Sequence, residues 1–228
     1  MQEIWWAAVI WVGTHLGISS TPLRKLLVGI LGTNGYLLAY SLLAAGSLGW
    51  LIWVYTQVPR FDYLWLPNPD LYWVAKITMV LAFILLVGGF MVKNPSNVGM
   101  TIEDPETAAE LATGVTRITR HPVQWAFLIW ALGHMVANGD LVSLIFFGSM
   151  AVVSGVGTVL MDFKKAQTLG PGWSTYTSVT SNLPFLAIAS GRNRLVWGEL
   201  LWPAVVGIGL YVLTYIFHEW LSGGAVIV

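Results

Sequence analysis

The sequence predicts an all-α integral membrane protein with six transmembrane helices in one bundle. Of the 228 residues, 56% are hydrophobic and only 10% are charged, and 13 are tryptophan. A soluble domain carries about 25% charged residues, so this composition leaves too little polar surface to cover a soluble globule. Apolar segments recur along the chain without a fixed repeat or a second domain. We therefore expect a single transmembrane domain over residues 1–228.

Six apolar segments are the predicted spans. They are Ile4–Ile18, Tyr36–Thr56, Leu71–Val92, Pro122–Ala137, Leu141–Met161 and Trp197–Phe217. A span needs about 20 apolar residues, so the first and fourth are short and must tilt or extend into their flanks. No basic residue precedes the N-terminal apolar run, which is atypical of a signal peptide. This run is therefore expected to be a real helix.

Basic residues divide unequally between the two sides of the predicted bundle. The connections 1–2, 3–4 and 5–6 contain nine of the eleven. These are Arg24, Lys25, Lys93, Arg117, Arg120, Lys164, Lys165, Arg192 and Arg194. Only Arg60 and Lys76 lie on the other side. The positive-inside bias predicts that both termini are non-cytoplasmic.

Three polar positions predict local structure between the spans. Asp104 followed by Pro105 resembles an N-cap with proline at the first helical position, which predicts a short amphipathic surface helix leading into the fourth span. Asp140 is expected to cap the fifth span. The Gly-Pro-Gly run at 170–172 predicts a turn.

Several classes of function are excluded or disfavoured by composition. The net charge is zero, so nothing indicates a nucleic-acid partner, and membrane lipids are the expected surroundings. The absence of cysteine excludes disulfides, thiolate metal ligands, a cysteine nucleophile and a cysteine-linked heme. There is no HExxH motif and no glycine-rich phosphate loop.

The four histidines, His15, His121, His134 and His218, are the main candidates for chemistry. An ionisable side chain within a span is a functional candidate, although a histidine bonded to a neighbour in the core is the alternative. His121 and His134 are separated by thirteen residues, about 20 Å along a helix and about 140° around it. They cannot share one metal, and each needs a partner from another helix.

His15 lies between two glycines in "GTHLG". Gly13 and Gly17 predict either close helix packing or room for a flat macrocycle whose iron the imidazole ligates. In a chain without cysteine, a b-type heme would be held by histidine, or less often by methionine or tyrosine.

Charged side chains near the span ends have two possible roles. Arg117, Arg120, Arg192 and Arg194 are either topology determinants that contact lipid phosphates or anchors for an anionic group such as a heme propionate. Asp162 is a candidate acid or base, and Glu219 could orient His218.

Several motifs resemble one family of bacterial membrane proteins. "THLGISS", "GVTRITRHPVQW", "ALGHMVANGDL", "TSNLPFLAIASGRNR" and "HEWLSG" run from the first span to the sixth in the order of the NnrU family. This family is associated with denitrification and nitric-oxide metabolism. It is similar to the plant zeta-carotene isomerase, a membrane protein with b-type heme that converts a cis double bond of a polyene to trans.

The resemblance implies heme b and a set of histidine ligands. The two ligands of the isomerase fall on His15 and His134, the histidine of its RHP motif on His121, and its C-terminal histidine on His218. Where the isomerase has a cysteine one turn before its second ligand, this chain has Ala131, so a thiol cannot take part in a ligand change.

Simple depth counting gives rival ligand pairs. It places His15 and His121 both toward the cytoplasmic end, and places His134 deeper, toward the side of His218. We therefore expect heme-binding residues among His15, His134, His121 and Arg120, with His15 and His134 as the iron ligands. The pairs His15/His121 and His134/His218 are the geometric rivals.

These observations lead to one main functional expectation and two alternatives. The main one is a heme b protein of a bacterial inner membrane that isomerises a carotenoid-like polyene or handles a small gaseous ligand such as nitric oxide. One alternative is a non-enzymatic regulatory or assembly factor for denitrification. The other is a methyltransferase that uses S-adenosylmethionine, because "RHP" and "GPGWSTY" resemble membrane methyltransferases.

Overall fold

The computed structural model describes residues 1–19 and 21–222. These residues form helices joined by loops, and they contain no β-strand. The chain begins with α1 (Gln2–Val12), which continues as a π-helical segment, η1 (Gly13–Ile18). The long helices are α2 (Pro22–Gln57), α3 (Pro69–Met91), α4 (Pro122–Ala137), α5 (Leu141–Val179) and α7 (Trp197–Ile216). Four short elements are η2 (Ala108–Leu111), η3 (Gly114–Arg117), α6 (Leu186–Ala189) and α8 (His218–Ser222).

Four of the long helices can cross a membrane by their length and composition. These are α2, α3, α5 and α7, whereas α4 is apolar but has only 16 residues. The all-helical, multi-pass character predicted from the sequence is therefore confirmed. Whether α1 and α4 also span the membrane, and which end faces the cytoplasm, stay predictions.

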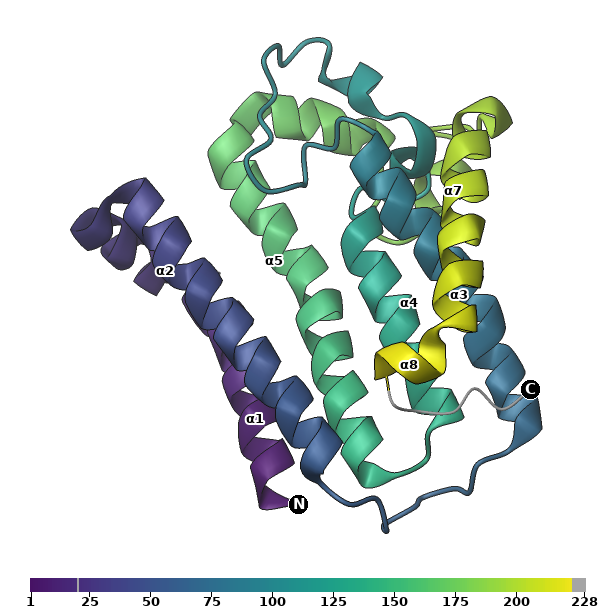
Figure 1. Cartoon of the computed structure of the whole chain (residues 1–228). Helices are drawn as coiled ribbons and strands as arrows, with labels where there is room; N and C mark the ends of the chain where they lie inside the picture. The colour runs from purple at the N-terminus through teal and green to yellow at the C-terminus, as the bar shows by residue number, and fades with distance from the viewer. Residues whose placement is uncertain (20, 223–228) are drawn as a thin grey trace.

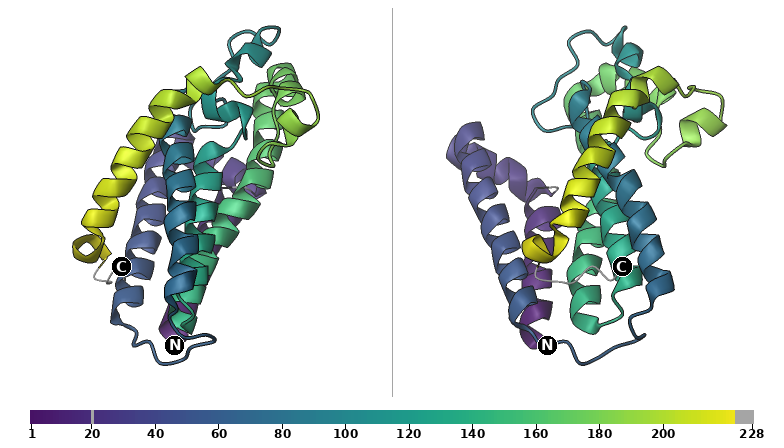
Figure 2. Two further views of the ribbon diagram at one scale, coloured as in Figure 1. Left: turned by 90° about the vertical axis from the view of Figure 1, so that its right-hand side faces the viewer. Right: turned by 45° about the vertical axis from the view of Figure 1, so that its right-hand side comes forward.

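α5 lies between two groups of helices (Figure 1). It packs against α1 and α2 on one side and against α4 on the other, and α3 packs against both α4 and α7. Two further views show α7 at the edge of the bundle, inclined to the other helices (Figure 2). Side chains from α1, α2, α4 and α5 form the largest buried cluster, which includes Ile4, Leu51, Ala131 and Phe146.

Two glycines allow α3 to approach its neighbours closely. A Cβ atom at Gly133 of α4 would lie 2.1 Å from Thr78 Oγ1 of α3, and one at Gly207 of α7 would lie 2.9 Å from the Ile84 Cα of α3. Small residues at such crossings are typical of packed membrane helices. Helices α3, α4 and α7 are therefore tightly packed against one another, whereas α2 contacts this group little.

The connections between helices gather at two opposite ends. At one end, two backbone hydrogen bonds link the α2–α3 and α4–α5 connections. Leu64 N–H donates to Gly139 O, and Leu141 N–H donates to Asp62 O, both at 2.8 Å. At the other end Arg120 N–H donates to Ser181 O at 2.9 Å. Connections that are far apart in the sequence therefore lie together at each end.

Two of the helices are longer than predicted because each bends at a glycine. Gly32 (φ +69°) interrupts α2 and Gly170 (φ +53°) interrupts α5, at a backbone conformation that residues with a Cβ rarely adopt. The predicted turn at 170–172 is thus a bend between two helical segments. Asp140 caps α5 as predicted, since it accepts from Ser143 N–H at 2.8 Å.

The predicted amphipathic helix after Asp104 is wrong. Asp104 does accept from Glu106 N–H at 2.9 Å, but the chain continues as two short 3-10 turns, η2 and η3. The reason is tertiary packing. Ala108 and Ala112 are buried beside Trp173 and Tyr176 of α5, and Gly114 has a positive φ of 56° that ends any regular helix.

Candidate functional site

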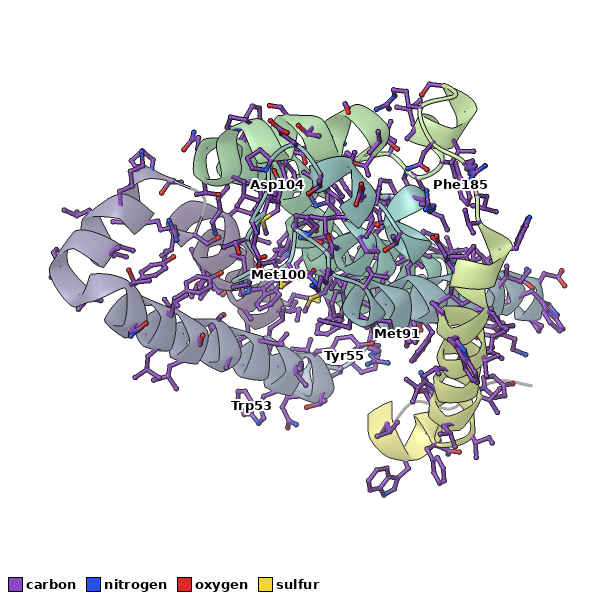
Figure 3. All side chains as sticks on the ribbon, turned by 90° about the horizontal axis from the view of Figure 1, so that it is seen from above. Trp53, Tyr55, Met91, Met100, Asp104 and Phe185 are labelled. Carbon is purple, nitrogen blue, oxygen red and sulfur yellow. The ribbon has the colours of Figure 1, made fainter. Side chains whose placement is uncertain are left out.

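A cavity of about 1380 Å³ lies between the α1–α2 pair and the α3, α4 and α7 helices, with α5 as a third wall. Its lining is mostly apolar and aromatic. Seen from above, Tyr55 is on the inner side of α2, whereas Trp53 is on the outer side (Figure 3). Binding pockets for small molecules are typically about 300–1,000 Å³. This cavity therefore has room for a cofactor together with a long apolar molecule.

His15, His134 and His218 all line this cavity, whereas His121 does not. His15 comes from the π-helical segment, His134 from the last turn of α4 and His218 from the start of α8. The structure thus brings three of the four sequence-predicted histidines to one site.

Hydrogen bonds set the ring orientation of His15 and His134. His15 Nδ1 lies 3.0 Å from Trp11 O, and His134 Nδ1 lies 2.9 Å from Trp130 O. A carbonyl oxygen can only accept, so each Nδ1 carries the proton and each Nε2 keeps its lone pair. Histidines that ligate metals commonly donate their other ring N–H in this way.

His134 and His218 are neighbours. Their ring centroids are 6.4 Å apart and their planes differ by 19°. His134 also stacks on Phe147 at 4.8 Å, and Tyr55 contacts Phe147 at 6.0 Å. This end of the cavity therefore combines two imidazoles with a wall of aromatic rings.

His15 lies at a different height in the same cavity. Its ring is 6.1 Å from that of Tyr40 and 3.7 Å from that of Trp11. Tyr40 precedes Tyr55 by fifteen residues on α2, which corresponds to about 22 Å of helix axis. Among the described residues, the ring contacts place His134 with His218 and not with His15. The assignment of His15 and His134 to one iron stays a prediction.

The surroundings of His15 argue against close helix packing at the two glycines of "GTHLG". A Cβ atom added to Gly13 or Gly17 would meet no other atom within 4 Å. Close helix packing at these glycines is therefore wrong, and space is left open beside the histidine. The π-helical form of Gly13–Ile18 is a further indication, since such segments occur frequently at functional sites.

Sequence reasoning assigned no cavity role to three cations that line the wall, Arg60, Lys76 and Lys164. The Arg60 guanidinium lies 4.4 Å from the Tyr55 ring centroid, and Lys76 Nζ lies 4.8 Å from that of Trp73. Neither forms a salt bridge within the described part of the chain. The signal available in the sequence was that Lys76 falls within a predicted span, where a charge is costly without a role.

His121 and Arg120 belong to a different, polar site. Arg120 Nε and Nη2 donate to the two Asp162 carboxylate oxygens at 2.7 and 2.6 Å, and His121 Nε2 lies 2.7 Å from Asp162 Oδ1. Asn182 Nδ2 donates to the same carboxylate at 3.3 Å. We call Arg120, His121, Asp162 and Asn182 the aspartate cluster. It ties the start of α4 to α5 and to the connection before α6.

Burial favours the neutral form of His121. The side chain is fully buried, and this burial lowers the pKa of His121, with the charges of Arg120 and Lys165 acting in the same direction against its bond to Asp162. Nε2 then donates to Asp162. Nδ1 is left as a buried acceptor with no partner among the described residues. Neither Arg120 nor His121 reaches the cavity, so the structure gives no support for either as a cofactor-binding residue.

Two other arginines at this end are also engaged within the protein. Arg117 donates from Nε and Nη2 to Glu199 at 2.8 and 2.9 Å, and this bond raises the pKa of Arg117. Arg192 Nη1 donates to the carbonyl oxygens of Thr177, Ser178 and Thr180 at the end of α5. Arg117 thus holds η3 to the start of α7, and Arg192 acts as a cation at a helix C-terminus.

Comparison with known proteins identifies one relative whose activity is named. The chain is similar to a maize (Zea mays) protein named 15-cis-zeta-carotene isomerase, chloroplastic, with 32% identity over 91 residues. That match covers 36% of this chain and 23% of the maize protein. The similarity therefore spans less than a quarter of the length of this relative. No solved structure matches the chain.

A protein family matches almost the whole chain. The match to the family described as NnrU protein extends over residues 3–226. It includes every helix of the bundle and all four histidines. The chain belongs to the NnrU family.

Proposed function

We propose that the protein binds heme b in the histidine-lined cavity and acts as a membrane isomerase on a hydrophobic polyene. The observation that carries this proposal is the presence of two cavity histidines, His15 and His134, whose Nδ1–H groups bond to backbone carbonyls and leave Nε2 available. Similarity to the maize isomerase supports the reaction type.

The donor set of the cavity fits a b-type heme. His134 would be one ligand of the iron, and either His15 or His218 would be a second. The family resemblance favours His15, whereas the 6.4 Å ring contact favours His218. Arg60 and Lys76, which have no carboxylate partner among the described residues, would hold the propionates.

When bound, heme would supply a redox-active iron. The chain itself supplies the surroundings of the substrate. Aromatic rings such as Phe83, Phe127 and Phe147 provide flat apolar walls that hold an extended polyene and keep water away from it. Because the fully buried Ala131 does not line the cavity, no side chain at that position competes for the iron.

The methyltransferase alternative finds no support at the residues that suggested it. Asp162 binds both Arg120 and His121, so these side chains are not available to a cofactor at the start of α4. No contact of the described residues favours the denitrification-factor alternative over the isomerase.

The heme proposal is tested by absorption spectroscopy of the purified protein, as isolated and after incubation with heme. We expect the wild type to show a Soret band. His134→Ala should abolish this band or lower the heme affinity by at least about 100-fold, because even residues that only orient a ligand contribute about 10–100-fold to the affinity. Comparing His15→Ala with His218→Ala identifies the second ligand. The control is His121→Gln, which should retain the band. A wild-type protein that shows no band after incubation with heme would exclude the proposal.

A further inference from the structure

A second pocket lies at the end of the molecule where most basic residues gather. Its volume is about 220 Å³, and it is formed by the start of α2 and the part of α5 around Lys164. Its polar lining consists of Ser19, Thr21, Arg24, Lys25, Lys164 and Gln167. We call it the basic pocket.

The bend at Gly32 gives the basic pocket its cations. It redirects the first ten residues of α2, a change of direction that is visible at the upper end of the helix (Figure 1). The Arg24 guanidinium lies 5.5 Å from the Tyr36 ring centroid, on the far side of the bend. The bend thus orients Arg24 from the side of α2, while Lys164 comes from α5.

The charges of the basic pocket are not balanced within the described part of the chain. No carboxylate lines the basic pocket. The three salt bridges among the described residues involve Glu199 and Asp162, and none of them includes Arg24, Lys25 or Lys164. Arg24 and Lys164 come from different helices, and their positive charges repel each other. An anion between them would remove this repulsion.

The basic pocket adjoins the histidine-lined cavity. Ser19, Leu160 and Lys164 line both spaces, so a polar pocket opens directly beside an apolar one. Large apolar side chains next to the pocket also face outward, among them Leu26 at 60% and Phe163 at 65% exposure. A ligand that matches these surroundings has an anionic head and a long apolar tail.

We propose that the basic pocket binds the phosphate group of an anionic phospholipid, whose chain extends into the cavity or along the apolar surface of α2. Anionic lipids are concentrated in the cytoplasmic leaflet, which is the side that the basic residues predict for this end. Basic pockets between membrane helices recognise lipid headgroups in this way. The headgroup site uses none of the cavity histidines, so variants can test it separately from heme binding.

The test measures thermal unfolding of the purified full-length chain in a neutral detergent. Phosphatidylglycerol, phosphatidylcholine and inorganic phosphate are titrated separately, and a ligand of the folded state raises Tm in proportion to its occupancy. We expect phosphatidylglycerol to raise Tm at a far lower concentration than either other probe. Each pocket cation contributes about fivefold in affinity, so Arg24→Gln/Lys164→Gln should bind about 25-fold more weakly.

The matched control is Lys93→Gln, which removes an exposed cation at the same end but outside the pocket and should leave the affinity unchanged. If the double variant does not fold, Lys164→Gln alone should still lose about fivefold. Equal phosphatidylglycerol binding by the pocket variants and Lys93→Gln would overturn the site. Equal effects of inorganic phosphate and phosphatidylglycerol on the wild type would assign free phosphate and overturn the lipid. His134→Ala should bind the lipid normally, which separates this proposal from that for heme.

Discussion

His134 and His121 occupy the two ends of α4, and their surroundings differ in almost every respect. His134 faces an apolar cavity, and its Nδ1 bonds to a backbone carbonyl within its own helix. His121 is fully buried, and its Nε2 bonds to the Asp162 carboxylate of another helix. One histidine can therefore offer a lone pair to a ligand, whereas the other fastens two helices together. Residue type and helix position alone would not separate these roles.

The comparison predicts that the aspartate cluster is structural, and Asp162→Asn is the strongest way to break it. The substitution leaves the Arg120 charge without its carboxylate partner. This pair is largely buried, since the Arg120 and Asp162 side chains are only 14% and 23% exposed. Removing one partner of a largely buried pair should cost about 3 kcal/mol in the free energy of unfolding. Chemical denaturation in detergent measures this loss. Asp104→Asn, at an exposed carboxylate, is the control and should cost less than about 1 kcal/mol.

The second prediction concerns the bend of α5 at Gly170, after which Trp173 lies with its ring centroid 6.3 Å from that of His121. Gly170 has φ +53° and ψ −128°, so Gly170→Ala should destabilise the protein by about 1–2 kcal/mol. Gly49→Ala is the matched control, because a Cβ atom there meets nothing within 4 Å inside a regular helix. It should be neutral or stabilising by up to about 1 kcal/mol. Equal effects of the two substitutions on Tm would show that the bend is not needed.

The third and smallest effect is a pH dependence that belongs to His121. Its pKa in the folded protein lies below the unfolded value of about 6.5, so the neutral side chain contributes fully above pH 6.5. As pH falls below 6.5, the unfolded chain takes up a proton that the folded chain resists, and stability decreases. The slope attributable to His121 is at most about 1.4 kcal/mol per pH unit.

This dependence is measured as the difference between wild type and His121→Gln in the free energy of unfolding at pH 7.5, 6.5 and 5.5. Subtraction removes the contributions of other titrating groups. The advantage of the wild type should shrink as the pH falls. An advantage that grows toward pH 5.5 would mean that His121 is protonated in the folded protein, as a salt-bridged cation beside Asp162.

Much of the helical framework was predictable because it depends on local sequence. The bounds of α4 and the start of α7 follow from apolar runs and from a proline or tryptophan at their first residue, and both predictions are confirmed. The lengths of α2 and α5 were not predictable in the same way. A glycine with positive φ can end a helix or bend it, and only the packing of the next segment decides between them.

The sequence by itself determined the all-helical membrane class, the grouping of basic residues at one end and the candidate histidines, since composition and periodicity are properties of the chain. Only the tertiary structure decided that His15, His134 and His218 share a cavity while Asp162 binds Arg120 and His121. The same holds for the basic pocket, where Arg24 and Lys164 are 140 residues apart in the chain. Such meetings depend on how helices pack and tilt, and no local pattern specifies them.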